Sequence, residues 1–154
     1  MRRIALLLSL VGMLCADEDV AKVVFDLTTN DLQTFERKVL KGIAAHKIYY
    51  EGNLKELDVA VVIHGGAYKF FVKEPQHSPF SDDQKLIEAH PTLQKRIAIM
   101  ADTYEVTFLM CKAALPKNKL QEKEIYDFVT MVPNATIGLI NKQQEGFSYV
   151  PIGD

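Results

Sequence analysis

The stretch LDVAVVIHGGAYKFFV, residues 57–72, decides the fold class. Its segment VAVVI is an uninterrupted apolar run, which is typical of a strand that is covered on both faces. The run stops at His64-Gly65-Gly66, where two adjacent glycines allow a sharp turn and a close approach of other groups to the backbone. The stretch therefore predicts a central strand of a parallel sheet, followed by a tight turn and the start of a helix.

The alternation of strand and helix continues on both sides of this stretch. Short β-branched or aromatic segments bounded by turn formers predict strands at residues 22–28, 104–111, 128–132 and 147–152. Helical spacing of apolar residues, or a capping residue, predicts helices at residues 32–46, 92–103, 118–127 and 135–145, with a weak helical turn at 82–89. This order predicts an α/β fold with a mainly parallel five-stranded sheet and helices on both faces.

The first residues, MRRIALLLSLVGMLCADEDV, have the layout of a secretory signal peptide. Two arginines precede an apolar segment, and small residues and then three acidic residues follow at the expected cleavage position. We therefore expect residues 1–16 to be removed, residues 17–154 to form one domain, and the mature protein to be periplasmic. The alternatives are a buried N-terminal helix or strand, and a lipoprotein signal in which Cys15 carries the lipid.

Composition and charge argue against several classes of function. Hydrophobic residues make up 48% of the chain and charged residues 25%, which is ordinary for a globular protein. No apolar run reaches the length of about 18 residues that a membrane span needs, so no membrane span is expected. The formal net charge is -2, and no basic stripe with interleaved aromatic residues is present, so nucleic acid is not expected as a partner.

The cysteine count is more informative. The chain contains Cys15 and Cys111, and removal of residues 1–16 would leave Cys111 as the single thiol. An intramolecular disulfide is then impossible, and an unpaired cysteine in an exported protein can act as a reactive thiol or form intermolecular disulfides. The four histidines show no metal-ligand spacing with Cys111, so no metal site is predicted.

Cys111 and the glycine turn are predicted to share one edge of the sheet if the strands that lead to them are neighbours. Ligands and catalytic groups gather beyond the carboxyl ends of parallel strands, and both Cys111 and His64 follow a strand. Lys112 adjoins the thiol, and a positive neighbour favours the reactive thiolate. The alternative is that Cys111 is a small buried hydrophobic residue and that His64 only bonds a nearby carbonyl group. Gly65 and Gly66 lack the third glycine of a dinucleotide fingerprint, so no cofactor is expected.

Three segments, VVIHGGAYKFF, YEVTFLMCKAAL and ATIGLINKQQEGFSYVPIG, resemble in that order the DsrE/DsrF-like family of sulfur-relay proteins. The resemblance is closest to the exported, single-domain branch of that family. Members of the branch typically show a strand ending in a His-Gly turn, a strand ending in a single cysteine, and a helix ending near Gln-x-Glu-Gly before an aromatic strand. Here the family's usual small or polar residues after Cys111 are replaced by Lys112 and two alanines.

The resemblance implies a three-layer α/β/α domain that assembles into trimers or hexamers. It also implies that Cys111 holds sulfur as a persulfide between a donor protein and an acceptor protein, as a sulfur carrier or a sulfurtransferase. On this hypothesis His64 handles protons, and Lys112 and the backbone amides of Gly65 and Gly66 stabilise negative charge on sulfur. Two alternatives are a non-catalytic oligomeric binding module with a buried structural cysteine, and a redox-responsive protein that forms an intersubunit disulfide.

Overall fold

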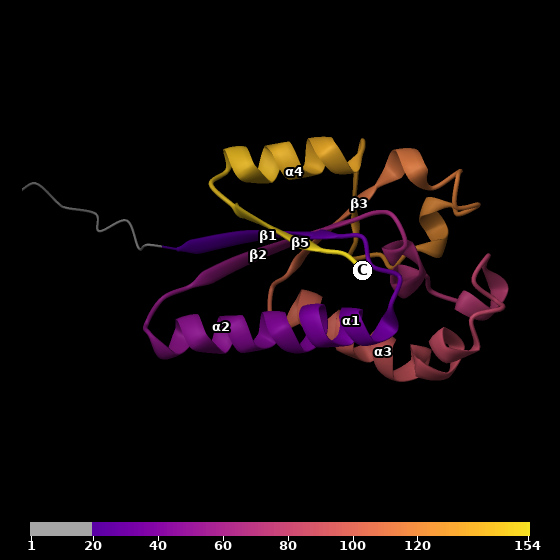
Figure 1. The fold of residues 1–154 in the computed structure, drawn as a ribbon, viewed down its shortest axis with the longest axis horizontal. Coiled ribbons are helices and arrows are strands. Elements are labelled where there is room, and N and C mark those ends of the chain that lie inside the picture. Colours follow the sequence, from indigo (N-terminus) through magenta and orange to yellow (C-terminus); the bar gives the residue numbers. More distant parts are fainter. Residues whose placement is uncertain (1–19) are drawn as a thin grey trace, which may run out of the picture.

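The computed structural model describes residues 20–154, so the predicted signal peptide (residues 1–16) and Cys15 lie outside the described residues. Five strands form one sheet in the order β4-β3-β2-β1-β5, and all four pairings between neighbours are parallel (Figure 1). The strands are β1 (Ala21–Leu27), β2 (Leu57–Ile63), β3 (Thr107–Cys111), β4 (Thr130–Val132) and β5 (Ser148–Ile152). The predicted α/β fold with a five-stranded sheet is therefore confirmed.

Helices cover both faces of the sheet and complete three layers. Helix α4 (Ala135–Gln144) packs over β1, β2 and β3 on one face. Helices α1 (Leu32–Phe35), α2 (Ile43–Gly52) and α3 (Gln84–Asp102) lie on the opposite face, as Figure 1 shows. The helix predicted at residues 135–145 begins as expected, because the Asn134 side chain accepts a hydrogen bond from the Ile137 amide at 2.9 Å.

The helical segment after β1 is longer than predicted. It runs from α1 through a π-helical segment (η1, Glu36–Gly42) into α2, and so reaches Gly52 instead of ending at residue 46. The apolar face that signals a helix stops at Ile43, because Ile48 and Tyr49 are largely exposed. The last turns of α2 therefore keep the helical backbone hydrogen bonds but lack the apolar periodicity that predicts a helix from sequence.

Helix α3 runs straight through Pro91, where the sequence predicted a break between a weak turn at 82–89 and a helix at 92–103. A proline inside a helix costs about 3 kcal/mol, because it lacks an amide hydrogen and crowds the preceding turn. Pro91 is exposed, whereas buried residues on both sides of it face the core. Each such side chain contributes about 1.5–3 kcal/mol, so burial outweighs the proline. These residues are Leu86, Leu93, Ile97 and Met100.

The helix predicted at residues 118–127 is wrong. This part of the structure is irregular, with one short 3₁₀ turn over Glu122–Glu124 that is opened by a capping box between Gln121 and Glu124. Ile125 forms an isolated antiparallel bridge with Val72 instead of continuing a helix. The buried residues here are Leu120, Ile125 and Tyr126, and their spacing is not helical. Contacts with the core therefore set the path of the chain through this segment.

The turn after the His64-Gly65-Gly66 sequence is held in place by an aromatic cluster. The predicted helix start at this point is a 3₁₀ turn, η2 (Ala67–Phe71). Phe70 stacks on Phe35 with ring centroids 4.3 Å apart, and Phe71 lies 5.2 Å from Phe108 of β3. Because these rings are fully or almost fully buried, they anchor η2 firmly between α1 and the sheet. The same turn carries Tyr68 toward the end of β3, next to Cys111.

Asp83 links stability to pH at the start of α3. Its carboxylate accepts hydrogen bonds from Lys69 Nζ at 2.7 Å and from the Leu86 amide at 3.1 Å. The Lys69 bond is the main cause that holds the pKa of Asp83 below its ordinary value. Since the folded-state pKa lies below the unfolded-state pKa of about 3.9, this contribution is present above that pH and is lost as the pH falls through the lower value.

We therefore expect Asp83→Asn to make the free energy of unfolding less dependent on pH between about pH 5 and pH 2 than in the parent protein. Urea denaturation at a series of pH values measures this dependence. The matched control is Asp82→Asn, which removes the same charge from an exposed neighbour. Equal pH dependence in the two variants would contradict the assignment to Asp83.

Candidate functional site

Cys111 and His64 lie side by side at the carboxyl edge of the sheet. Ile63 of β2 is paired with Met110 of β3, so the next residue of each strand, His64 and Cys111, follows at the same level. Cys111 is in turn paired with Val132 of β4. The prediction that the glycine turn and the thiol share one sheet edge is confirmed, because β2 and β3 are neighbours.

The Cys111 thiol is free but nearly buried. Only 6% of the residue is exposed. The hydroxyl of buried Tyr68 donates a hydrogen bond to the Cys111 carbonyl oxygen at 2.6 Å. Burial, and after it the contact with the Cys111 side chain, raise the pKa of Tyr68 well above its ordinary value, so the phenol stays a donor. Sequence reasoning missed Tyr68, because an aromatic residue within AYKFF reads only as core.

His64 belongs to a hydrogen-bonded chain of three side chains from three adjacent strands. Its Nε2 lies 2.5 Å from Asp26 Oδ1, and Asp26 Oδ2 accepts a hydrogen bond from the Tyr149 hydroxyl at 2.7 Å. The bond to Asp26 also raises the pKa of Tyr149. Asp26 was missed in the sequence, although a lone carboxylate inside the apolar strand KVVFDLT is a signal of this kind of partner.

Lys112 does not face the thiol as an isolated positive charge. Its Nζ lies 2.5 Å from Glu122 Oε1, and the two side chains are 59% and 48% exposed. The ammonium group is therefore paired with a carboxylate at the surface, and a role beside sulfur requires this ion pair to open. The predicted binding role of Lys112 stays a prediction.

The two glycines are required by the protein's own backbone. Gly65 has φ +60°, a left-handed conformation that favours glycine. A Cβ atom on Gly66 would lie 2.5 Å from the Asn30 Cβ atom. The Gly66 amide donates to the Thr28 carbonyl oxygen at 3.0 Å. The close approach expected from the sequence is thus made by the loop after β1, and the Gly66 amide can bind an anion on sulfur only if it gives up this bond.

Other parts of the described chain add no metal site. Within residues 20–154, no group of three His, Cys, Asp or Glu residues is arranged to hold a metal ion. In the same residues, no helix combines the length and apolar character that crossing a bilayer requires. The side chains of Cys111, His64, Asp26, Tyr68 and Tyr149 supply a thiol, an imidazole, a carboxylate and two phenols.

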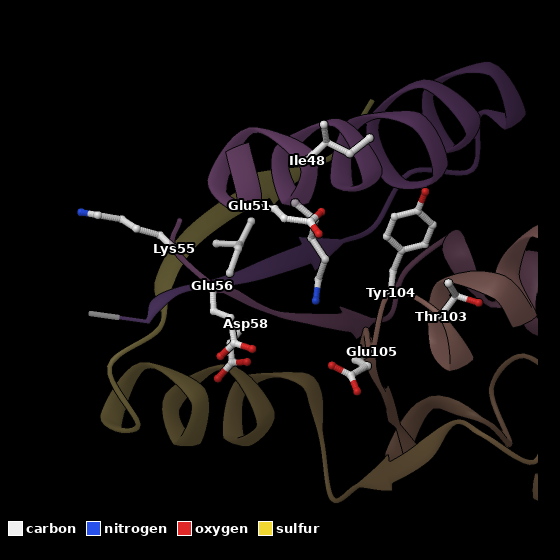
Figure 2. A pocket seen from close by; sticks show the side chains of 10 residues that line it. Ile48, Glu51, Lys55, Glu56, Asp58, Thr103, Tyr104 and Glu105 are labelled. Atoms are coloured by element: carbon white, nitrogen blue, oxygen red, sulfur yellow. The ribbon is translucent and has the colours of Figure 1, made fainter. Parts of the chain in front are cut away.

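A hollow of about 460 Å³ lies at the opposite edge of the sheet (Figure 2). Its walls come from the end of α2, the start of β2 and the turn before β3, whereas Cys111 is at the far end of β3. The lining includes two lysines and four carboxylates but neither a thiol nor an imidazole. The hollow therefore lacks the groups that sulfur chemistry needs. Its charged residues are Lys47, Lys55, Glu51, Glu56, Asp58 and Glu105.

We expect Tyr68→Phe to lower the free energy of unfolding by about 1–3 kcal/mol, because the buried Cys111 carbonyl loses the hydrogen bond from the phenol. Urea denaturation measures the change. Tyr49→Phe is the matched control, since the Tyr49 ring is 68% exposed. A Tyr68→Phe variant as stable as the control would show that the hydroxyl contributes nothing at this position.

The fold and the site together define a three-layer α/β protein with a nearly buried thiol at the carboxyl edge of a parallel sheet. A family model described as the DsrE/DsrF-like family matches residues 12–152. The chain belongs to the DsrE/DsrF-like family, which is associated with sulfur relay. The family expected from the three sequence segments is therefore confirmed.

One individual protein sequence and one solved structure illustrate what this chain is similar to. An uncharacterized protein of Aquifex aeolicus (strain VF5) is 28% identical over 131 residues, which are 84% of this chain and 55% of that protein. The chain thus spans about half the length of this curated relative. The solved structure of MTH1491, a protein of unknown function from Methanobacterium thermoautotrophicum, has a TM-score of 0.55 and 17% identity, covering 85% of this chain and 98% of that chain. At this identity the likeness concerns the fold alone.

Proposed function

We propose that the protein is an exported sulfur carrier that holds sulfane sulfur as a persulfide on Cys111 and passes it to an acceptor protein. The observation that carries the proposal is the position of Cys111. It is the single cysteine of residues 20–154, and it is the last residue of β3, on the strand next to the one that His64 follows, at the carboxyl edge of the sheet. Membership of a family associated with sulfur relay supports the same chemistry.

The transfer needs only thiol chemistry. The Cys111 thiolate attacks the outer sulfur of a persulfide on the donor, a new S–S bond forms on Cys111, and the donor leaves as a thiolate. The thiolate of the acceptor then attacks the outer sulfur on Cys111 and regenerates the Cys111 thiol. Each step exchanges one S–S bond for another, so the cycle requires neither a redox cofactor nor a metal.

Burial of Cys111 favours a second candidate function. A free cysteine that is only 6% exposed is also what a small core residue looks like. In that case the protein is a non-catalytic oligomeric binding module, and Cys111 packs between β2 and β4. The same burial argues against an intersubunit disulfide, because that bond requires the thiol to reach the surface.

The intact mass of the protein isolated without reductant tests the proposal. A sulfur carrier shows an additional mass of about 32 Da on Cys111 that dithiothreitol removes, as expected for a persulfide. A plain thiol that resists alkylation in the folded protein and reacts quickly after denaturation favours the binding module. The same mass also shows where the mature chain begins. It therefore distinguishes a chain that starts at residue 17 from one that carries a lipid on Cys15.

Exposed apolar side chains support the proposal that the protein is a trimer or a hexamer. Ile137 and Ile140 of α4 are exposed, as are Tyr149 and Val150 of β5, an edge strand of the sheet. Exposed apolar residues next to an open strand edge are typical of a surface that another chain covers. Size-exclusion chromatography with light scattering should therefore give the mass of three or six chains. A monomer would contradict this part of the proposal.

A further inference from the structure

The Asp26 carboxylate joins side chains from the strands on both sides of β1. Oδ1 lies 2.5 Å from His64 Nε2 of the β2 turn, and Oδ2 accepts from the Tyr149 hydroxyl of β5 at 2.7 Å. The Asp26 side chain is only 15% exposed, and its neighbours in β1, Phe25 and Leu27, are buried. A carboxylate at such a place loses hydration, and the two hydrogen bonds compensate for this loss.

We propose that Asp26 and Tyr149 are positioning residues, which hold His64 in one tautomer and one orientation so that its Nδ1 accepts the proton of the Cys111 thiol. Their role in sulfur transfer rests on the proposed function.

The tautomer follows from the hydrogen bonds. An ionised carboxylate only accepts hydrogen bonds, so a neutral His64 bonded to Asp26 through Nε2 carries its proton on that nitrogen. Nδ1 then keeps its lone pair and is the nitrogen available as a base. The Tyr149 hydroxyl holds the second oxygen of Asp26, so the carboxylate cannot rotate freely away from the imidazole. A base oriented by a third group in this way is the usual arrangement around an activated nucleophile.

The sheet register places His64 at the position next to Cys111. His64 follows the residue paired with Met110, so it stands beside Cys111 on the neighbouring strand. Neighbouring strands are about 4.8 Å apart, so the backbone positions that carry the imidazole and the thiol are adjacent. The His64 side chain is 30% exposed, so the imidazole also meets solvent and an incoming donor.

The step balances without an outside reagent. The Cys111 thiol gives its proton to His64 Nδ1, and a sulfur lone pair forms a bond to the outer sulfur of the persulfide donor. The S–S bond of the donor breaks, and its electron pair leaves on the donor thiolate. That thiolate then takes the proton from Nδ1, so one thiol and one persulfide become another thiol and another persulfide.

The tautomer of His64 is the first readout. A change in an ion pair that only stabilises the fold would leave this tautomer as it is. In ¹⁵N spectra recorded at alkaline pH, where imidazoles are neutral, the parent protein should show His64 protonated at Nε2. Asp26→Asn should give a mixture of the two tautomers, because an amide can both donate and accept. A His64→Gln variant identifies the signals.

The alkylation rate of Cys111 by iodoacetamide in the folded protein is the second readout, and it needs no sulfur donor. Asp26→Asn and His64→Gln should each lower the rate about tenfold or more. The double variant should be no slower than His64→Gln alone, because Asp26 acts through His64. Asp58→Asn is the matched control, since Asp58 is an exposed carboxylate of β2 at the other sheet edge.

Tyr149→Phe covers the case in which Asp26→Asn does not fold. It removes one hydroxyl from a half-exposed ring and should lower the alkylation rate about two- to fivefold. An unchanged tautomer, or an unchanged rate in Asp26→Asn and Tyr149→Phe, would overturn the positioning role. A double variant of Asp26→Asn and His64→Gln that is alkylated more slowly than His64→Gln alone would also overturn it.

A persulfide donor such as glutathione persulfide separates this inference from the proposed function. If the parent protein takes up no sulfur while Asp26→Asn changes both the tautomer and the alkylation rate, the proposed function fails and the positioning of His64 stands. If Asp26→Asn loads sulfur on Cys111 as fast as the parent protein, the positioning role fails and the proposed function stands.

Discussion

Replacing Cys111 by serine should abolish persulfide formation and lower sulfur transfer by at least about 100-fold, because the proposed intermediate is a sulfur–sulfur bond on this residue. A serine hydroxyl has nearly the shape of the thiol, but it is not ionised at neutral pH and it forms no stable bond to sulfane sulfur. The parent protein is first incubated with glutathione persulfide. Its gain of about 32 Da is then followed by intact mass, and the sulfide released by dithiothreitol is followed in parallel.

Met110→Leu is the matched control for this variant. It changes the adjacent buried residue of the same strand with almost no change in volume, so it tests whether disturbance of β3 alone stops transfer. Cys111→Ala is a second variant for the case in which a buried hydroxyl destabilises the strand. Full transfer by a folded Cys111→Ser protein would end the sulfur-carrier proposal and leave the binding module.

Alanine at Gly66 should lower the free energy of unfolding by about 2–3 kcal/mol, the largest stability change expected here from the addition of one methyl group. The new Cβ atom would lie 2.5 Å from the Asn30 Cβ atom and 3.2 Å from the Asn30 Cα and amide nitrogen atoms. Two of these three atoms belong to the backbone, so a side-chain rotation cannot relieve the contact. The loop after β1 or the turn after β2 must move instead, and the hydrogen bond from Gly66 to Thr28 weakens.

Urea denaturation of Gly66→Ala and of Gly52→Ala measures the effect. Gly52 is the last residue of α2, and a Cβ atom there would meet nothing within 4 Å. We expect Gly52→Ala to be unchanged or up to about 1 kcal/mol more stable, because alanine favours the helix. Similar stabilities for the two variants would show that the turn after β2 can move to accept a Cβ atom at position 66. The contact with Asn30 would then not explain why this position is a glycine.

The candidate site was only partly predictable from the sequence. Cys111 and His64 each end an apolar strand, and the end of a strand is visible in a single segment. Asp26 and Tyr149 lie 123 residues apart, and only the pairing of β1 with β5 brings them within 2.7 Å. Tyr68 is similar, because its hydroxyl meets the Cys111 carbonyl 43 residues further along the chain. No local pattern carries information about such a partner.

The sequence by itself determined the fold class, four of the five strands closely, and the strand ends at which Cys111 and His64 lie. Each of these depends on short-range apolar runs and on turn residues, which act within a few positions of the chain. Only the tertiary structure decided that α3 continues through Pro91, that residues 118–127 are irregular, and that the ammonium group of Lys112 pairs with Glu122. The physical reason is the same in each case: burial and pairing with distant residues outweigh local preferences of about 1–3 kcal/mol, and the free energy of those contacts exists only once the sheet and its helices are assembled.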